Sequence, residues 1–409
     1  MDRIGEIRAL FPALAQQVYG KSLVYLDNAA TAQKPQPVIR KLVEMNGQYT
    51  ANAHRAVHYL AGKATDAYEG ARDAVAAWMG AASREEIVFT SGTTASINLV
   101  AFSFGEAFVK EGDEIVVTTA DHHSNIVPWQ MLCQRKKAVL KVWDVEDDGH
   151  LSLLKLPELL TDRTRLVAVP HISNVLGIVN PVKDIVTLCH GKGIPVLVDG
   201  AQGSVHGHIN VQDTDCDFYA LSGHKIYAAS GTGVLYGKKK WLSAMPPYMG
   251  GGEMIETVRF SGTTYAPLPG KFEAGTQNLS GVPTLVPAIE FLQTALEDPE
   301  IAAEQERIRD YMLAFFDGRD DLRLFGVPRR TMDKINLYSF VAEGAHHEDL
   351  ALILDKMGIA VRSGQMCAEP LMDRFGVTGM LRASFAAYNT LEEAKYFTQS
   401  LEKALQMLR

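Results

Sequence analysis

The sequence contains little cysteine, no long apolar run and no large cluster of positive charge. Its four cysteines are scattered and form no C-x-x-C pair: Cys133, Cys189, Cys216 and Cys367. This pattern argues against a structural zinc site and against a disulfide framework. Each cysteine is therefore either part of a buried core or a reactive thiol.

The apolar runs are too short for a membrane span, which needs about 18 consecutive apolar residues. The N-terminal stretch MDRIGEIRALFPAL carries acidic residues and a proline where a signal peptide has an unbroken apolar core. The net charge is −8, and the longest basic block, residues 238–240, is interpreted as a solvated turn. We expect a soluble, cytoplasmic protein that binds neither a membrane nor nucleic acid.

Short apolar segments alternate with helical patterns from residue 65 to about 240. The segments are EIVFT, DEIVVTT, RLVAVPHIS, PVLVDG, FYALSG and GVLYG, and the helical pattern TDAYEGARDAVAAWMG precedes the first of them. This alternation is typical of βαβ units around a mostly parallel sheet that is buried on both faces. In such an α/β domain, ligands bind at the carboxyl ends of the strands.

A chain of 409 residues is too long for one compact core, and its pattern changes after residue 285. The segments KINLYSFVA, HEDLALILDKMG, IAVRSG and RASFAAYNT predict a smaller α+β domain. Its last helix begins with a capping box, Thr390 and Glu393, and carries one apolar face: Leu391, Ala394, Phe397, Leu401, Leu405 and Leu408. We expect a large domain over residues 26–285, a small domain over residues 286–409, and an N-terminal segment, residues 1–25, that associates with the small domain.

Polar side chains follow several of the predicted strands. In TSGTT, the hydroxyls of Thr93 and Thr94 and free N–H groups would form an anion site at a helix start, although ordinary capping explains them as well. Asp199 directly follows PVLV, where a buried acid needs a cationic or N–H partner unless it caps a helix. In FYALSGHK, burial of Lys225 would lower the pKa of its amine and allow a Schiff base.

Together these features match the needs of pyridoxal 5'-phosphate. Its phosphate needs donors, such as Ser222 and His224, its ring nitrogen needs a carboxylate, and its aldehyde needs an amine. A nicotinamide cofactor fits less well, because the glycines of SGTGVLYG precede a strand and do not open a helix.

The histidines are the remaining candidates. His122 and His123 are adjacent on an extended segment, so their rings point in opposite directions and one can face the site. His54 and His58 would share a helical face as metal ligands, but no third ligand lies nearby in the sequence. We therefore expect one ring at the site and no metal.

Motifs from about residue 23 to 390 carry a resemblance to a known family. They are YLDNAAT, NAHRAVH, TSGTT, DHHSNIVPWQ, HISNVLG, VLVDGAQ, DFYALSGHKIY, GGGEMI, FEAGTQN, VRSGQMCAEPLM and RASFAAYNT. The sequence resembles the fold-type I, class V pyridoxal-phosphate enzymes, and specifically the group II (Suf-type) cysteine desulfurases, which are grouped with selenocysteine lyases. The short loop around Cys367, without an insertion, is what indicates group II.

The resemblance implies a role for each matching residue. Lys225 would form the Schiff base, Asp199 would face the ring nitrogen, and Cys367 would be the nucleophile. The other implied cofactor contacts are Gln202, His122, Thr93, Thr94, Ser222, His224 and, toward a neighbouring subunit, Thr276. The implied substrate contacts are Arg382, Asn174, Arg362, His54 and Arg55, with an arginine fork on the substrate carboxylate.

The activity implied by the resemblance converts L-cysteine to L-alanine and leaves a persulfide on Cys367. The sulfur would pass to an acceptor protein of the Suf system for iron–sulfur cluster assembly, and the enzyme would be a homodimer. Two alternatives stay open. One is a selenocysteine lyase or another class V enzyme, such as a kynureninase-like hydrolase, in which Cys367 is dispensable; the other is a non-catalytic sulfur carrier that kept the fold.

The chain departs from the family pattern at three places. GHKIYAASG stands where the family has GHKLYGPTG, FEAGTQN where it has GTPN, and QMC where it has HHC or QHC. The last change removes a histidine beside Cys367 that can favour a reactive thiolate. We therefore expect a difference in turnover, or in preference between cysteine and selenocysteine.

Overall fold

A seven-stranded sheet forms the centre of the larger part of the molecule in this computed structural model, which describes residues 3–54, 56–327 and 333–409. Its strand order is β4-β10-β9-β8-β7-β5-β6. The five strands from β9 to β6 run parallel to one another. Strand β10 is antiparallel to both of its neighbours, β4 and β9. The predicted mostly parallel sheet is confirmed, with these strands: β4 (Ile87–Thr90), β5 (Glu114–Thr118), β6 (Val139–Trp143), β7 (Thr164–Pro170), β8 (Val196–Asp199), β9 (Phe218–Ser222) and β10 (Gly233–Gly237).

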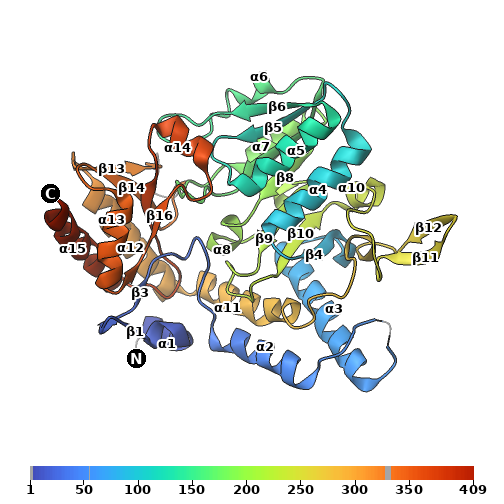
Figure 1. The fold of residues 1–409 in the computed structure, drawn as a ribbon, viewed down its shortest axis with the longest axis horizontal. Helices are drawn as coiled ribbons and strands as arrows, with labels where there is room; N and C mark the ends of the chain where they lie inside the picture. Colours follow the sequence, from blue (N-terminus) through green and yellow to red (C-terminus); the bar gives the residue numbers. More distant parts are fainter. Residues whose placement is uncertain (1–2, 55, 328–332) are drawn as a thin grey trace.

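The sheet is buried on both faces because its side chains alternate between two apolar clusters. In β7, Val167 and Val169 pack into one cluster, while Leu166 and Ala168 pack into the other. Helices α3 (Tyr59–Met79), α7 (Val182–His190) and α11 (Leu285–Glu297) contribute to the first cluster, and α4 (Thr93–Phe108), α5 (Val127–Lys136) and α10 (Lys239–Ala244) to the second. Figure 1 shows the resulting layers around the sheet. Burial on both faces explains the nearly continuous apolar runs of these strands.

The parallel direction brings five loops to the same edge of the sheet. Strands β4 and β9 share one direction because each is antiparallel to β10, and β5, β7 and β8 follow that direction as well. The segments after these strands are the start of α4, η3 (His123–Asn125), residues 171–176, the residues before α8 (Gly203–His206), and residues 223–225. These loops lie at the carboxyl ends of the strands, where α/β sheets bind their ligands.

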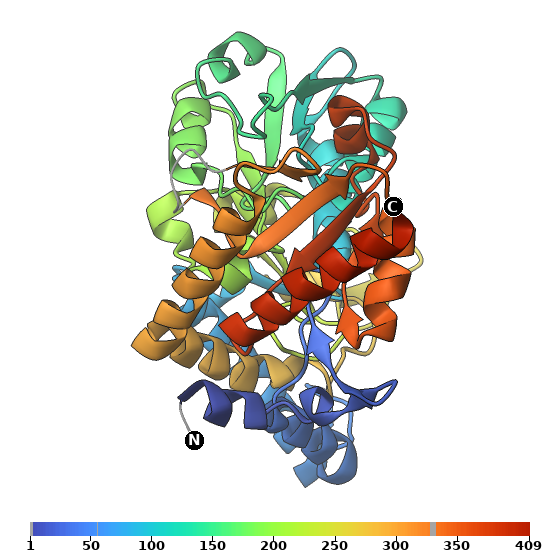
Figure 2. The same ribbon diagram turned by 90° about the vertical axis from the view of Figure 1, so that its left-hand side faces the viewer.

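A four-stranded antiparallel sheet lies in the C-terminal part of the chain. Its order is β13-β14-β17-β16, with β13 (Leu322–Phe325), β14 (Leu337–Ala342), β16 (Arg362–Gly364) and β17 (Met380–Ser384). Helices α12 (Pro299–Phe316), α13 (His347–Lys356) and α15 (Leu391–Leu408) pack on it, and Figure 2 shows α15 crossing it diagonally. The predicted capping box of Thr390 and Glu393 is confirmed, and the apolar face of α15 lies in the core of this unit.

The N-terminal segment packs on both parts of the molecule, with Ile4, Ile7, Phe11 and Leu14 in the first apolar cluster of the large sheet and Val24 in the core of the small one. It contains α1 (Arg3–Ala9), η1 (Pro12–Ala15), β1 (Gln17–Val18), β2 (Lys21–Ser22) and β3 (Val24–Tyr25), and β3 pairs in parallel with β15 (Ile359–Ala360). Arg3 Nε lies 2.7 Å from Asp298 Oδ2, while the ring of Phe11 packs on Phe291 and Tyr388. The domain boundaries after residues 25 and 285 stay predictions.

Several elements were not predicted from the sequence. These include β6, α12, β13 and the hairpin of β11 (Ile255–Arg259) and β12 (Gly262–Tyr265), which projects from the molecule in Figure 1. The hairpin escaped prediction because almost all of its side chains are exposed and it has no apolar alternation. The remaining elements are α2 (Gln36–Gln48), η2 (Arg84–Glu86), α6 (Leu156–Leu159), α9 (Val211–Thr214), η4 (Gly270–Phe272), η5 (Val282–Thr284) and α14 (Glu369–Phe375). Among the described helices, none has the length and apolar character of a membrane crossing.

Candidate active site

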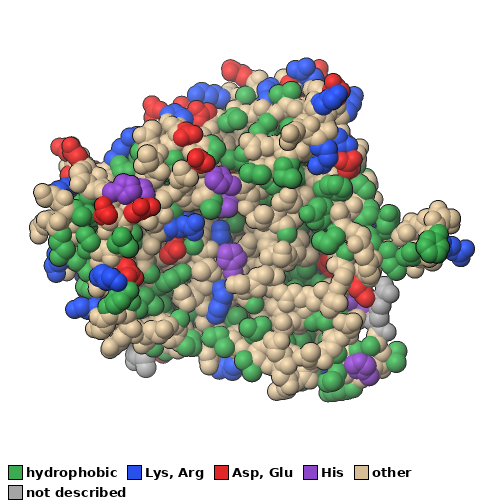
Figure 3. All heavy atoms as spheres, in the orientation of Figure 1, with side chains coloured by type: hydrophobic (Ala, Val, Ile, Leu, Met, Phe, Trp, Pro, Cys, Tyr) green, Lys and Arg blue, Asp and Glu red, His purple; other side chains and the backbone are tan. Residues whose placement is uncertain are grey.

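A cavity of about 170 Å³ lies where the loops of the seven-stranded sheet meet the small sheet. Figure 3 shows basic and histidine side chains gathered between these two parts of the molecule. The lining residues are Ala29, Ala30, Thr93, Thr94, His122, Ser124, Pro170, Ile172, Asn174, Asp199, Ala201, Gln202, Ser222, His224, Lys225, Arg362, Met366, Cys367 and Arg382. The structure therefore brings together the predicted site residues that it describes, except Thr276 and His54.

The start of α4 supplies a cluster of hydroxyl and N–H groups. Gly92, with φ of 149°, turns the chain from β4 into α4. The Thr93 N–H donates to Ser222 Oγ at 2.8 Å, and the Thr93 hydroxyl lies 2.8 Å from the same oxygen. Thr94 Oγ1 lies 2.7 Å from Ser124 Oγ. Hydroxyls at the positive end of a long helix suit a phosphate group.

Asp199 ends β8 at the cavity and is only 5 % exposed. Its Oδ1 accepts a hydrogen bond from the Ala201 N–H at 2.9 Å. Burial raises the pKa of Asp199, and the neighbouring amine of Lys225 counteracts this rise. Because a buried carboxylate is stabilised by a charged N–H facing it, this position suits a pyridinium nitrogen.

Lys225 follows β9, on a turn fixed by Ala32 and Lys34. The His224 carbonyl accepts hydrogen bonds from the Ala32 N–H at 3.1 Å and from Lys34 Nζ at 2.9 Å. Burial lowers the pKa of Lys225 to about 8, although Asp199 acts in the opposite direction. A large fraction of the amine is therefore neutral near pH 8, as a nucleophilic or basic lysine requires.

The turn after Lys225 is the AAS segment, in which the chain departs from the pattern of the family that it resembles. The Ala229 N–H donates to Thr284 Oγ1 at 3.0 Å, and the Thr232 hydroxyl donates to the Ala229 carbonyl at 2.6 Å. A Cβ at Gly223 would lie 2.1 Å from Thr232 Oγ1, so only glycine fits there. The two threonine hydroxyls hold the turn in this chain.

The two adjacent histidines have different surroundings. His122 lines the cavity, and burial together with the charge of Lys225 lowers its pKa to about 3, so the ring is neutral at physiological pH. The His123 ring accepts a hydrogen bond at Nε2 from the Glu369 N–H at 3.0 Å. The His123 N–H donates to the Cys367 carbonyl at 2.8 Å. His123 therefore restrains the loop of Cys367 at two backbone positions, the Cys367 carbonyl and the Glu369 N–H.

The loop of Cys367 has a strained backbone that its neighbours hold in place. Met366 and Cys367 have φ values of 55° and 56°, in the left-handed region that residues with a side chain rarely adopt. Asn174 Nδ2 donates to the Met366 carbonyl at 2.9 Å, and the Met366 side chain is buried in the core. Arg362 Nη2 lies 3.8 Å from Cys367 Sγ. The thiol thus has a fixed position beside a guanidinium group.

Arg382 lies in β17 opposite Arg362 of β16 and is 1 % exposed. Its Nη1 donates to the Asn174 carbonyl at 2.8 Å, and its Nη2 donates to Asp27 Oδ1 at 3.0 Å. Burial lowers the pKa of Arg382, while Asp27 counteracts this effect. Its Nε is buried without a partner among the described residues, which leaves a donor for a carboxylate ligand.

Some predicted residues lie elsewhere. Thr276 lines a separate cavity beside Tyr68 and Phe89. The His54 ring lies 3.0 Å from Glu69 Oε1, and His58 caps α3 by accepting from the Ala61 N–H. Arg55 lies outside the described residues. The roles of Thr276, His54 and Arg55 therefore stay predictions.

Sequence reasoning did not assign several residues that support the site. Asp27 pairs with Arg382. Its position in the motif YLDNAAT, after a short strand, was the one sequence feature that could have indicated a role at the site. Ser124 and His123 belong to DHHSNIVPWQ, but only the structure shows the partners of their side chains. No sequence motif indicated a role for Lys34, because its hydrogen bond to the His224 carbonyl joins two distant parts of the chain.

The chain is similar to a known family and to known proteins and structures. The family "Aminotransferase class-V" matches residues 24–397. A probable cysteine desulfurase of Vibrio cholerae is 44% identical over 408 residues, with 100% of both chains covered. A cysteine desulfurase of Pectobacterium carotovorum is 46% identical over 99% of this chain and 98% of that protein. The crystal structure of the cysteine desulfurase CsdA of Escherichia coli, in an S-sulfonic acid form, has a TM-score of 0.90 at 38% identity over 100% of both chains.

The fold, the cavity and these similarities define the class: the chain belongs to the class V aminotransferase family. The buried acid, the lysine of lowered pKa and the hydroxyl cluster fit pyridoxal 5'-phosphate, the cofactor of this family. Within the family, the chain is a cysteine desulfurase.

The lowered pKa of Lys225 gives a first prediction. In the apoenzyme, the reactivity of this amine toward acetic anhydride, measured by competitive labelling and mass spectrometry, should rise with a midpoint near pH 8 and level off above it. Exposed lysines, with a pKa near 10.4, should keep rising. Asp199→Asn should shift the midpoint for Lys225 to lower pH, since this carboxylate raises the pKa of the amine. A midpoint near 10 in the unmodified chain would contradict the prediction.

The bond between His123 and Glu369 gives a second prediction. His123→Ala leaves the loop less restrained, so we expect roughly fivefold lower kcat, equivalent to about 1 kcal/mol, and faster alkylation of Cys367 by iodoacetamide. His123→Gln can still accept the bond and should recover part of both effects. Cofactor content is the control and should not change. Unaltered kcat and alkylation in His123→Ala would show that the bond does not position the thiol.

Proposed function

We propose that this desulfurase transfers sulfur from L-cysteine to the thiol of Cys367 and releases L-alanine. The observation that carries the proposal is that Cys367, Lys225 and Arg382 line one small cavity. The reaction needs a nucleophilic thiol, an amine that takes up and returns a proton, and a receptor for the substrate carboxylate. These three side chains supply those groups.

The cavity would hold pyridoxal 5'-phosphate in one orientation. The phosphate would lie between Thr93 and Thr94 at the start of α4 and Ser222 and His224 at the end of β9. The ring nitrogen would face Asp199. When bound, the cofactor withdraws electrons and stabilises negative charge on the substrate carbons. His122, as a neutral ring, would stack on it, and Gln202 would meet its phenolic oxygen. The Gln202 side chain is fixed by the bond from its Nε2 to the Ala29 carbonyl at 2.8 Å.

Lys225 would act first as the anchor of the cofactor and then as the base. Its Nζ would remove the proton of the substrate α-carbon, for which a pKa of about 8 is well suited near neutral pH. Cys367 Sγ would then attack the substrate sulfur. The S–S bond forms as the C–S bond breaks, and the electron pair left on carbon is protonated, which yields the methyl group of alanine. The sulfur stays on Cys367 as a persulfide.

Arg382 would bind the substrate carboxylate, with Asn174 beside it. Its bonds to Asp27 and to the Asn174 carbonyl fix the guanidinium plane, so that less conformational freedom is lost when substrate binds. Arg362 would contribute a second cation, between the carboxylate and the thiol. Two arginines and one aspartate leave the local charge positive, which suits an anionic group.

We also propose that the persulfide sulfur passes to an acceptor protein of the Suf system, for iron–sulfur cluster assembly in the cytoplasm. In support, the Cys367 side chain is partly exposed, so another thiol can approach it. A selenocysteine substrate presents the same carboxylate and amine to the site, and its rate should be measured beside that of cysteine.

A homodimer is proposed from the position of Thr276. It lines a cavity of about 280 Å³ that is separate from the catalytic cavity and is partly walled by the exposed residues Tyr248 and Met249. Apolar surface of this kind is typical of subunit interfaces. In the dimer, Thr276 would reach the phosphate held by the other subunit.

Cys367→Ser tests the proposed chemistry. We expect alanine and sulfide formation from L-cysteine to fall by about 100-fold or more, because the hydroxyl does not accept sulfur, while the absorbance of bound cofactor is kept. Cys133→Ala, a buried thiol outside the cavity, is the matched control and should keep its rate. A normal rate in Cys367→Ser would refute the assignment and favour an enzyme in which this thiol is dispensable.

The dimer has its own test. Sedimentation equilibrium should give twice the chain mass of 44.8 kDa. Thr276→Ala should weaken cofactor binding roughly fivefold, as expected for one lost hydrogen bond of about 1 kcal/mol. Thr294→Ala, on the exposed side of α11, is the control and should bind the cofactor normally. A monomer with unchanged cofactor affinity in Thr276→Ala would contradict the proposal.

A further inference from the structure

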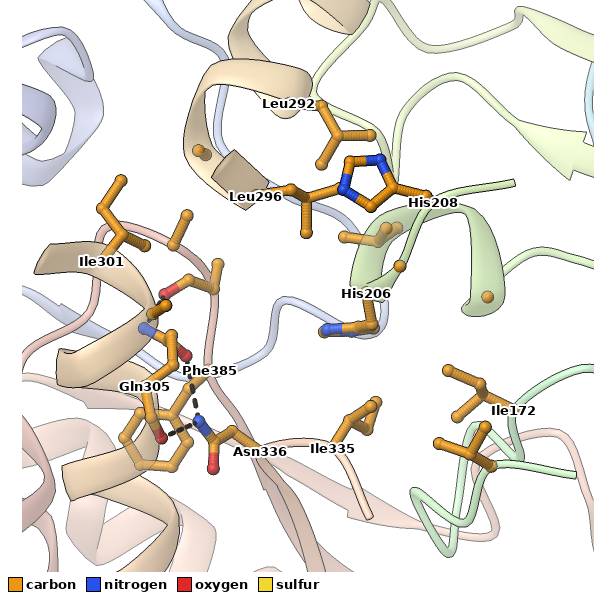
Figure 4. Close-up of a pocket in the computed structure, with 18 of the residues that line it drawn as sticks. Ile172, His206, His208, Leu292, Leu296, Ile301, Gln305, Ile335, Asn336 and Phe385 are labelled. Atoms are coloured by element: carbon orange, nitrogen blue, oxygen red, sulfur yellow. Dashed lines mark hydrogen bonds between the residues drawn. The ribbon is translucent and has the colours of Figure 1, made fainter. Parts of the chain in front are cut away.

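A second cavity, of about 420 Å³, is lined by residues of α8 and lies beside the catalytic cavity, with which it shares Ile172. Figure 4 shows it between α8, the ends of α11 and α12, and the segment that leads into β14. Much of its wall is apolar, formed by Ile172, Val205, Leu292, Leu296, Ile301 and Phe385. Its volume is within the range of small-molecule sites, which is roughly 300–1,000 Å³.

Apart from Tyr227, the ionisable side chains that line this cavity in the described part of the chain are all basic. Lys334, Arg309, His206, His208 and His171 line it, and the described lining contains neither aspartate nor glutamate. Lys334 is 2 % exposed, and its Nζ donates to the Leu176 carbonyl. Burial lowers the pKa of Lys334 to about 7, which is the effect expected of an amine without a carboxylate partner.

Two further basic side chains have a nitrogen without a partner among the residues that the structure describes, although Arg309 Nη2 lies 4.0 Å from Glu306 Oε1. The Nε of Arg309 is buried without a partner among the described residues. The His206 ring makes no hydrogen bond within the described part of the chain, and Figure 4 shows it directed into the cavity. Burial and the charge of Lys225 lower its pKa to about 4. An anion here would accept hydrogen bonds from these buried nitrogens.

The amide groups of the cavity are already engaged. Asn336 Nδ2 donates to the Gln305 carbonyl and to Gln305 Oε1, at 2.8 and 3.0 Å, and its Oδ1 accepts from Tyr338. Gln305 Nε2 donates to the Ala386 carbonyl at 3.1 Å. The basic groups, not the amides, therefore determine which ligand the cavity selects.

We propose that this cavity is a binding site for a small organic anion, a carboxylate with an apolar body. The carboxylate lies against Lys334, Arg309 and His206, and the apolar body lies against the aliphatic wall. The site joins the large sheet to the small sheet, since His206 belongs to the first unit and Lys334 and Arg309 to the second. Ile172 lines both cavities, so the ligand lies next to the catalytic site without entering it.

Hexanoate is the probe for this proposal, titrated into the holoenzyme by isothermal calorimetry without L-cysteine. Hexan-1-ol has the same apolar body without charge, and inorganic phosphate has charge without an apolar body. We expect saturable binding of hexanoate and at least about tenfold weaker binding of both others, a difference of about 1.4 kcal/mol. No saturable heat with hexanoate, or equal affinity for hexan-1-ol, would overturn the proposal.

Variants locate the bound probe. Lys334→Met and Arg309→Gln should each weaken hexanoate binding about fivefold or more. Arg309 is partly exposed, so its variant keeps the test valid if Lys334→Met does not fold. Arg382→Gln removes a cation of the catalytic cavity and should leave hexanoate binding unchanged. Loss of binding in Arg382→Gln, with normal binding in Arg309→Gln, would place the probe in the catalytic cavity and refute the second site.

Discussion

The common direction of five strands is the constraint on which the rest of the molecule depends. Because β4, β5, β7, β8 and β9 end at one edge of the sheet, the residues that follow them meet in one cavity. The strands are buried on both faces, so a shift of register by one residue would exchange the two apolar clusters and misplace every loop. The positions of Asp199 and Lys225 therefore follow from the packing of the sheet.

The small sheet completes the site from the opposite side. Its antiparallel register places Arg362 opposite Arg382, and the loop after β16 carries Cys367 into contact with residues of the large sheet. Asn174 and His123 hold this loop in a left-handed conformation that it would not adopt alone. The thiol of Cys367 is thereby held in one position beside Arg362.

Burial is the common cause of the unusual protonation behaviour at the site. The same loss of hydration raises the pKa of Asp199 and lowers the pKa values of Lys225 and His122. The pKa values of Asp199 and Lys225 thereby move toward neutral pH, where proton exchange costs little free energy, whereas the pKa of His122 moves away from it and the ring stays neutral. In the second cavity, burial of Lys334 has the same effect on an amine outside the catalytic machinery.

The sequence alone determined the α/β class, most strands, the capping box and most residues of the cavity. It could do so because the alternation of short apolar segments with helical patterns, and the residue types at strand ends, are local signals. It also placed Cys367 and Lys225 in one site through resemblance of motifs. Only the tertiary structure decided that Asp27 pairs with Arg382, that His123 holds the thiol loop, and that Lys334 and His206 share a second cavity. These contacts join residues up to 355 positions apart, and no local pattern encodes a partner so distant in the chain.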